Sequence, residues 1–135
     1  MDRTDEILDL LQQMKAAKKY YFASLKPSDL EKDLCVVYTI TNKNTNEVLY
    51  VGRTTKLRRR LYTNHLMGNL STARLKKYLI GDENIMEVDD EETAKTYLQN
   101  NCYFQYIEEP DARKRGQLEG LFSFLLNVRY IEKEH

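Results

Sequence analysis

Two short hydrophobic runs decide the fold: Val36-Val37-Tyr38-Thr39-Ile40 and Leu49-Tyr50-Val51-Gly52. Both runs are rich in β-branched and aromatic residues, which favour β-strands. The stretch between them, residues 42–46, reads Asn-Lys-Asn-Thr-Asn and is typical of a turn. The sequence therefore predicts a β-hairpin with strands over 34–41 and 47–52. A pairing centred on Asn44 sets Tyr38 directly opposite Tyr50 on one face of the sheet, with Cβ atoms about 5 Å apart.

A long helix is expected before the hairpin. Thr4 begins it, and apolar residues then recur at helical spacing from Ile7 to Leu25. Pro27 ends the helix, because proline lacks an amide donor and clashes with the preceding turn. Residues 26–33 are expected to connect this helix to the hairpin.

After the hairpin, helical and strand-like segments alternate. The expected elements are helices over 56–67, 71–80, from Asp89 or Asp90 to Gln99 and from Asp111 onward, and strands over 84–88 and 102–108. This order predicts the α+β class, with a small mixed β-sheet that begins with the hairpin and is flanked by helices. The first helix is an addition at the N-terminus.

Length and composition indicate one compact unit, with the N-terminal helix and connector over 1–33 and the main part over 34–135. The hydrophobic residues, 41% of the chain, are too scattered for a membrane span. The polar, acidic N-terminus is unlike a secretory signal. Cys35 and Cys102 lack metal-site spacing, so we expect reduced core cysteines and a cytoplasmic protein.

A net charge of zero hides two regions of opposite charge. Residues 48–81 contain no acid, and residues 82–92 are strongly acidic. A basic region attracts polyanions, so we expect it to bind nucleic acid. The candidate binding residues are Arg53, Lys56, Arg59, Arg74 and Lys77. The alternative is a pair of solvated surfaces that attract each other.

In this setting the chain resembles the GIY-YIG nuclease domain over roughly residues 34–131. The matching pieces are Val36-Val37-Tyr38, Tyr50-Val51-Gly52, Arg60, and Arg115-Gly116-Gln117-Leu118-Glu119. The resemblance implies that Tyr38 is a general base, that Tyr50 supports it, and that Arg60 stabilises phosphate charge. It also implies that Glu119 binds one Mg²⁺ or Mn²⁺ ion, and that the protein is a metal-dependent endonuclease acting on DNA.

The chemistry of these residue types agrees with such roles, and each residue also has a plainer interpretation. An arginine fork suits a pentavalent phosphate, but Arg60 can equally be a solvated residue of a basic run. The usual pKa of tyrosine, near 10, makes it a poor base unless positive charge lies nearby, and Tyr38 with Tyr50 can be simple cross-strand packing. Glu119 can pair with Arg115 one turn before it.

Some positions depart from the family pattern. Val36 replaces the first glycine, and Asn64 stands where many members have a histidine. His65 comes one residue late, and on a regular α-helix it points away from Arg60. Gly52, Asn64 and His65 are secondary candidates for the site. Gly52 is expected to allow close approach of backbone or substrate.

At the C-terminus, Ile131 stands where the family tends to have an asparagine, and Asn127 comes four residues earlier. These departures keep open a catalytically weakened domain that binds nucleic acid or protein. The N-terminal helix lies outside the resemblance, and it either packs on the core or mediates a homodimer.

Overall fold

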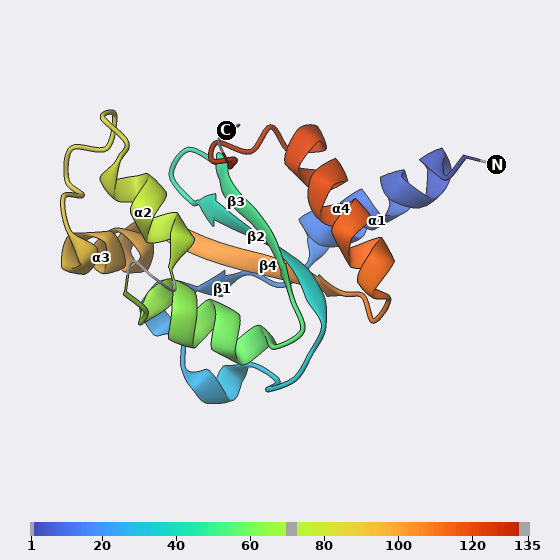
Figure 1. Ribbon diagram of the computed structural model, residues 1–135, viewed down its shortest axis with the longest axis horizontal. Coiled ribbons are helices and arrows are strands. Elements are labelled where there is room, and N and C mark those ends of the chain that lie inside the picture. Colours follow the sequence, from blue (N-terminus) through green and yellow to red (C-terminus); the bar gives the residue numbers. More distant parts are fainter. Residues whose placement is uncertain (1, 70–72, 133–135) are drawn as a thin grey trace.

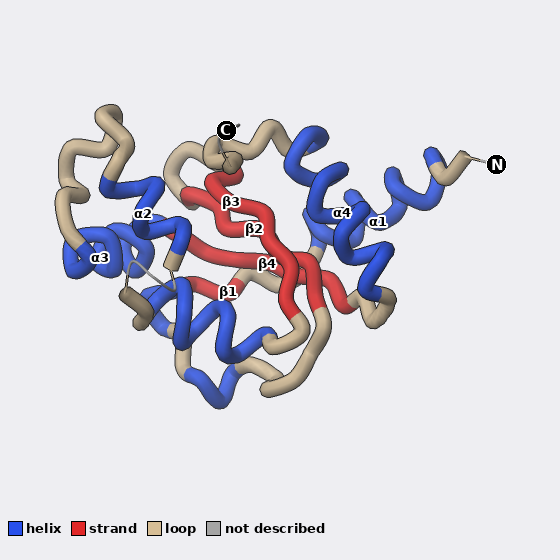
Figure 2. The backbone as a smooth tube through the Cα atoms, in the orientation of Figure 1, coloured by secondary structure: helices blue, strands red, loops and turns tan. Residues whose placement is uncertain are grey.

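A four-stranded antiparallel sheet forms the centre of the molecule, in the strand order β1-β4-β2-β3 (Figure 1). The computed structural model describes residues 2–69 and 73–132. The α+β class is confirmed, with the strands gathered between groups of helices (Figure 2). All strand pairings in these residues are antiparallel, so the sheet is not mixed. Among the described residues, no helix has the length and apolar character needed to cross a membrane.

The expected hairpin forms from β2 (Val36–Asn42) and β3 (Val48–Thr54). Its register differs from the expected one, because Tyr38 pairs with Gly52 and Tyr50 pairs with Ile40. A bulge after Ile40 shifts the pairing, and Asn46 turns the chain with a φ of 60°. The two tyrosines are therefore diagonal neighbours rather than a directly opposed pair. They still share one face of the sheet, since a shift of two residues preserves the alternation of side chains.

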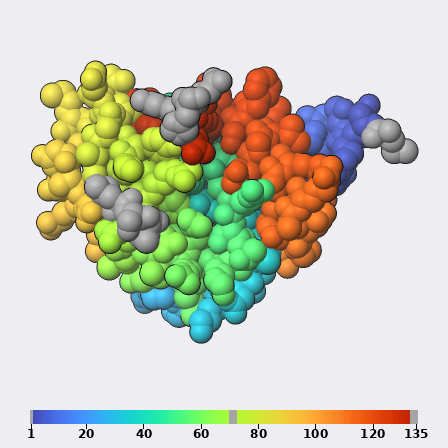
Figure 3. Space-filling model, viewed as in Figure 1, coloured from blue at the N-terminus to red at the C-terminus, as the bar shows by residue number. Residues whose placement is uncertain are grey.

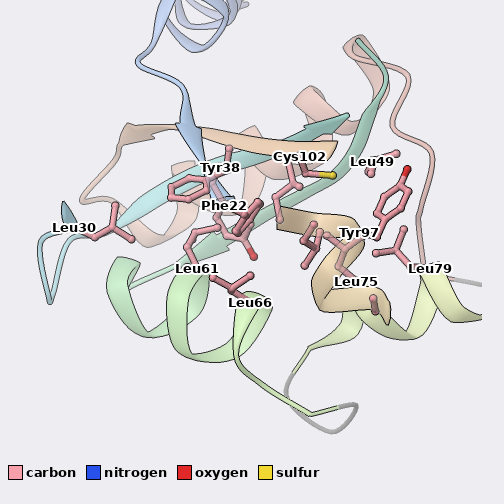
Figure 4. Packing of buried hydrophobic residues seen from close by; sticks show 14 of the residues in the cluster. Phe22, Leu30, Tyr38, Leu49, Leu61, Leu66, Leu75, Leu79, Tyr97 and Cys102 are labelled. Atoms are coloured by element: carbon pink, nitrogen blue, oxygen red, sulfur yellow. The ribbon is translucent and has the colours of Figure 1, made fainter. Parts of the chain in front are cut away.

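Both faces of the sheet are covered, which explains why all seven residues of β2 are buried. One face packs on α1 and α4 through a small core that includes Val37, Leu118 and Phe122. The other face carries the larger core, and Figure 4 shows Phe22 and Tyr38 meeting the leucines of the helix after the hairpin. A central strand covered on both faces loses the alternation of polar and apolar residues.

The N-terminal helix α1 spans Thr4–Ala16 and is shorter than expected. The prediction that it reaches Leu25 is wrong, because the chain becomes extended and forms the edge strand β1 (Tyr20–Tyr21) against β4. The Gln105 side chain donates to the carbonyl oxygens of Lys15 and Ala17, at 3.1 and 2.9 Å, and so satisfies the end of the helix. The helical spacing of apolar residues continues to Leu25, but the helix ends at Ala16, where Gln105 from β4 binds its last carbonyl groups.

The remaining elements follow the expected order with one exception. Asp90 and Asp111 cap α3 and α4 through their side chains, as expected. The predicted strand over 84–88 is wrong, since this segment forms turns. The predicted start of α2 at Ser71 lies outside the described residues. The further bounds are η1 (Phe22–Ser24), η2 (Pro27–Asp29), α2 (Arg74–Ile80), α3 (Glu91–Asn101), β4 (Cys102–Glu108) and α4 (Ala112–Leu125).

The helix after the hairpin is a π-helix, η3 (Arg59–Leu66), rather than the regular α-helix that the sequence predicts. At its end the Met67 amide donates to the Tyr62 carbonyl five residues earlier, at 3.0 Å. The buried ammonium of Lys76 donates to the carbonyl oxygens of Leu66 at 2.6 Å and Gly68 at 2.8 Å. Lys76 therefore closes the C-terminal end of this helix and is not part of an exposed basic surface.

Replacement of Lys76 by methionine is expected to destabilise the fold by about 2–3 kcal/mol, because two buried carbonyls lose a charged donor. Lys77→Met is the matched control, because Lys77 is the next residue on the same helix and its side chain is exposed. Urea unfolding of both variants measures the difference. Equal free energies of unfolding would show that the bonds from Lys76 contribute nothing to stability.

Candidate active site

Three aromatic rings from three elements meet at the candidate site. The Tyr38 hydroxyl lies 2.7 Å from Nε2 of His65 in a buried hydrogen bond. The His65 ring packs edge-on against Tyr38 and Tyr50, with centroid distances of 5.5 and 5.2 Å. The two tyrosine rings stack with their centroids 6.3 Å apart. The hairpin and η3 are thus joined by one polar contact inside an apolar cluster.

His65 is expected to point away from Arg60 on a regular α-helix, but this helix is a π-helix and His65 contacts Tyr38 and Tyr50. In an α-helix, residues five apart are turned from each other by about 140°. The wider turn of a π-helix brings positions i and i+5 to nearly the same side. His65 therefore reaches the sheet although it follows Arg60 by five residues. Asn64 stays half-exposed and lines a pocket together with Arg60.

Gly52 lies under the Tyr38 ring. A Cβ atom added at this position would collide with the hydroxyl and the ring of Tyr38. The close approach expected at Gly52 is thus made by a side chain of the opposite strand. The pairing of Tyr38 with Gly52 is the register that gives the ring room to cross β3 and reach His65.

Burial keeps all three rings neutral. It raises the pKa of Tyr38 well above its usual value, although Arg60 and Arg74 oppose the shift. Burial also raises the pKa of Tyr50, against the same two arginines. The pKa of His65 falls to about 3 through burial first, and then through the charges of Arg60 and Lys76. Tyr38 is only 1% exposed, so in this state it is a neutral phenol rather than a free phenolate base.

A polar pocket opens beside this cluster at the end of β3. It has a volume of about 280 Å³ and is lined by Thr54, Thr55, Lys56, Arg59, Arg60 and Asn64. The Nε atom of Arg60 is buried and, among the described residues, has no hydrogen-bond partner. Two threonines and three basic side chains line the pocket, and such a lining is suited to an anion. The pocket has the chemistry of a phosphate site.

Glu119 faces the site from α4, and the alternative of an ion pair with Arg115 is excluded. Arg115 is buried and donates to the carbonyl oxygens of Glu109 and Pro110, so it does not pair with Glu119. Arg53 lies closest, with its Nε 3.9 Å from the carboxylate, and its guanidinium fills the space over Gly116. Burial raises the pKa of Glu119, and the charges of Arg53, Arg74 and Arg60 oppose that shift.

The basic run divides into structural and exposed members. Lys76 closes η3, and Arg58 donates twice to the Leu30 carbonyl. Lys56 and Arg59 are exposed and line the pocket. Arg74 begins α2 and is 3.9 Å from Glu132. The exposed Lys77 has no contact with the ring cluster or the pocket in the described part of the chain.

The C-terminal segment has a structural role. Asn127 adopts a φ of 50° directly after α4, a conformation that asparagine tolerates at helix ends. Arg129 and Tyr130 donate their amides to Val48 and Leu49, so the segment lies along β3, and Ile131 is exposed. Neither Asn127 nor Ile131 therefore supplies an amide group to the ring cluster.

The comparisons with known proteins agree with this geometry. The family model of the GIY-YIG catalytic domain matches residues 34–108, more than half of the chain, and the protein belongs to this family. The family implies a nuclease-type function on nucleic acid, generally with a divalent metal. Searches of curated proteins and of solved structures give no significant match. The matched range contains Tyr38, Tyr50 and Arg60 and ends before Glu119.

Glu119 is suited to hold a hard cation. Its carboxylate is about one-third exposed, at 36%, and oxygen ligands are those that Mg²⁺ prefers. The described residues contain no cluster of three or more acidic, histidine or cysteine side chains that could hold a metal. Glu119 would thus be the protein's one ligand in this part of the chain, with water and phosphate oxygens completing the shell.

Sequence reasoning missed the pocket hydroxyls of Thr54 and Thr55 and the ring contact of His65. The threonines directly follow Gly52 and Arg53, at the point where β3 ends and η3 is about to begin. Hydroxyls between a strand and a basic helix are a usable signal for an anion pocket. No sequence pattern predicts the position of His65, because a π-helix cannot be told from an α-helix by residue spacing in this segment.

Neutral, buried His65 should make stability depend on pH. Its pKa is about 3 in the folded state, against an ordinary value of 6.5, so between these values only the unfolded chain takes up the proton. The stability from His65 is therefore present above pH 6.5 and decreases as the pH falls toward 3, by up to about 1.4 kcal/mol per pH unit.

Urea unfolding of wild type and His65→Gln across this pH range provides the measurement. We expect the stability advantage of the wild type to shrink as the pH falls, because glutamine does not titrate. The other titratable groups change the free energy of unfolding of both proteins equally, so their contribution cancels in the difference. Parallel pH profiles of the two proteins would contradict the assignment.

Proposed function

We propose that the protein is a metal-dependent endonuclease that hydrolyses phosphodiester bonds of DNA. The observation that carries the proposal is the pocket at Arg60, which lies next to the ring cluster of Tyr38, Tyr50 and His65. The charge of Arg60 affects the pKa values of both tyrosines and of Glu119, so one bound phosphate would interact with all of them. The family membership supports the same reaction class.

In the proposed reaction Arg60 binds the scissile phosphate and stabilises its developing negative charge. Tyr38 takes a proton from the attacking water while it passes its own proton to Nε2 of His65. The new P–O bond forms as the bond to the leaving oxygen breaks, and the leaving oxygen takes a proton from water. Tyr38 thus acts as a relay, which suits a phenol that burial keeps neutral.

A bound phosphate would also prepare His65 to accept this proton. The positive charge of Arg60 contributes to the low pKa of His65. A phosphate that neutralises Arg60 removes part of that effect, and so raises the pKa of His65 toward its usual range. Tyr50 packs on the same ring and holds it in place.

A divalent ion held by Glu119 would supply Lewis-acid stabilisation of the phosphate and of the leaving oxygen. The role of the chain's own residues is to hold the carboxylate in position. The Nε atom of Arg53 lies 3.9 Å from the Glu119 carboxylate, and its positive charge partly offsets the negative charge there. Mg²⁺ is the expected ion, with Mn²⁺ as a substitute of similar ligand preference.

A binding-only domain is the second candidate function. Tyr38 is 1% exposed, and Ile131 stands at the family's asparagine position. A domain that had lost catalysis could keep Arg60, Arg59 and Lys56 to bind nucleic acid. Cleavage assays separate this candidate from the nuclease, whereas binding assays do not.

Glu119→Gln is expected to abolish metal-dependent nicking of plasmid DNA while binding persists or tightens, because a negative charge near the phosphate is removed. Glu83→Gln is the control, since this acid is exposed and lies in the turn after α2. The measurement is the nicking rate with Mg²⁺ or Mn²⁺. If wild type leaves every DNA and RNA substrate intact, the nuclease proposal fails and the binding-only candidate replaces it.

The exposed basic residues between positions 48 and 81, at the pocket and on α2, are expected to give salt-dependent DNA binding. Changing Lys56, Arg59 and Lys77 together to glutamate should remove most of the affinity and flatten the plot of log affinity against log salt. The control makes the same charge change at exposed lysines outside residues 48–81, namely Lys15, Lys32 and Lys43. Fluorescence anisotropy over a salt series measures both. An unchanged affinity in the first triple variant would mean that DNA binds elsewhere.

A further inference from the structure

A second aromatic stack lies beside the candidate active site, where α2 meets the C-terminal segment. The rings of Tyr78 and Tyr130 are parallel to within 6°, and their centroids are 5.3 Å apart. Figure 3 shows the C-terminal segment, in red, between the yellow-green surface of α2 and the orange surface of α4. The amide of Tyr130 donates to the Leu49 carbonyl at 3.1 Å, so the stack adjoins β3. Neither ring takes part in the reaction proposed above.

The Tyr130 ring is the fixed member of the pair. Its hydroxyl donates to the Asp82 carboxylate at 2.6 Å, and Nε of Arg129 donates to the same carboxylate at 2.8 Å. The Arg129 guanidinium also lies over the Tyr130 ring, 5.7 Å from its centroid. Tyr130 packs against the larger core as well. A ring that is held from several sides gives the ring stacked on it a defined orientation.

Tyr78 is the outer member of the pair. It lies in the last turn of α2, is half-exposed and, in the described part of the chain, is not among the side chains that pack against the larger core. Leu75 and Leu79 of the same helix enter that core instead. One plain role for Tyr78 is to fasten the C-terminal segment to α2. Its partial exposure also leaves an aromatic surface for a ligand.

Arg74 precedes Tyr78 by one helical turn, so the two side chains lie on the same side of α2. The Arg74 side chain is 59% exposed. Its ion pair with Glu132 is 3.9 Å long and exposed on both sides, so this pair contributes little and leaves the guanidinium accessible. An accessible arginine beside an aromatic ring matches the two parts of a nucleotide, because the guanidinium binds phosphate and the ring stacks on a base.

Both side chains are close to the candidate active site. Burial raises the pKa of Tyr50, and the charge of Arg74 opposes this rise more than that of Arg60 does. Tyr78 also acts on the Tyr50 hydroxyl, in the same direction as burial. Arg60 and Arg74 thus act on one ring. A DNA strand with a phosphate in the Arg60 pocket would place a nearby nucleotide at Arg74 and Tyr78.

We propose that Tyr78 stacks on an unpaired base of the DNA substrate while Arg74 binds the phosphate of the same nucleotide. The proposal rests on the proposed function for its substrate, and it specifies which DNA the site prefers. A base in a paired duplex is already stacked between its neighbours and must leave them before it can reach Tyr78, whereas a base in a single strand is free to do so. Single-stranded or branched DNA is therefore preferred to a fully paired duplex.

The fluorescence of 2-aminopurine, a base analogue that is quenched when it stacks on an aromatic ring, tests the contact without cleavage. The probe is an oligothymidine strand with interspersed 2-aminopurine, alone or paired with its complement, and no divalent metal is added. We expect wild type to quench the single strand and to bind it more tightly than the duplex. Tyr78→Leu should abolish the quenching and weaken single-strand binding by about 5- to 150-fold, the range for one base–aromatic stack, with unchanged duplex affinity. Tyr78→Trp should retain both, because it keeps an aromatic ring.

Tyr21→Leu is the matched control. Tyr21 is 41% exposed and packs on Tyr103 with ring centroids 5.5 Å apart, but it lies on β1, at the opposite edge of the sheet from β3. This variant should quench and bind like wild type. Urea unfolding of Tyr78→Leu measures the fastening role separately, since that role changes stability without changing the ratio of single-strand to duplex affinity.

Three results would overturn the proposal: a wild type that does not quench the probe, quenching that persists in Tyr78→Leu, and an equal loss in Tyr21→Leu. The first of these is read from wild type alone, so it holds even if Tyr78→Leu is unstable. Quenching that depends on Tyr78 in a protein that cleaves no DNA would refute the nuclease and keep the stacking site. Cleavage without such quenching would do the reverse.

Discussion

The hydrogen bond between the Tyr38 hydroxyl and Nε2 of His65 is the contact on which the candidate site depends. It links the central strand β2 to η3 inside the larger core, where a lost partner would leave a buried polar group unsatisfied. Three features are arranged around it. Gly52 leaves room for the ring, the π-helix turns His65 inward, and Lys76 holds the end of that helix.

The same region concentrates positive charge. Burial raises the pKa of Glu119, and Arg53, Arg74 and Arg60 all oppose that rise. A buried donor of Arg60 is left without a partner in the described chain. A phosphate bound there, as in the proposed function, would offset this concentration of positive charge. Burial and the charge of Arg60 together also lower the pKa of His65 and so make its ring a weak base.

Several features could be predicted because they depend on neighbouring residues. The hairpin follows from two β-rich runs around an asparagine-rich turn, and the starts of α3 and α4 follow from Asp90 and Asp111. The predicted end of α1 at Leu25 was wrong because Gln105, far away in the sequence, satisfies the helix at Ala17. The predicted pairing of Tyr38 with Tyr50 was wrong because a bulge and the fit of a ring over Gly52 set the register.

The sequence by itself determined the family, the β-hairpin and the identities of Tyr38, Tyr50, Arg60 and Glu119 as candidates, since these depend on residue type and spacing along one chain. Only the tertiary structure decided which groups meet. The hydrogen bonds of a π-helix span five residues instead of four, a difference too small to leave a pattern in the sequence, yet it decides whether His65 reaches Tyr38. The pairing of Glu119 with Arg53 rather than Arg115 likewise depends on how α4 packs across β3.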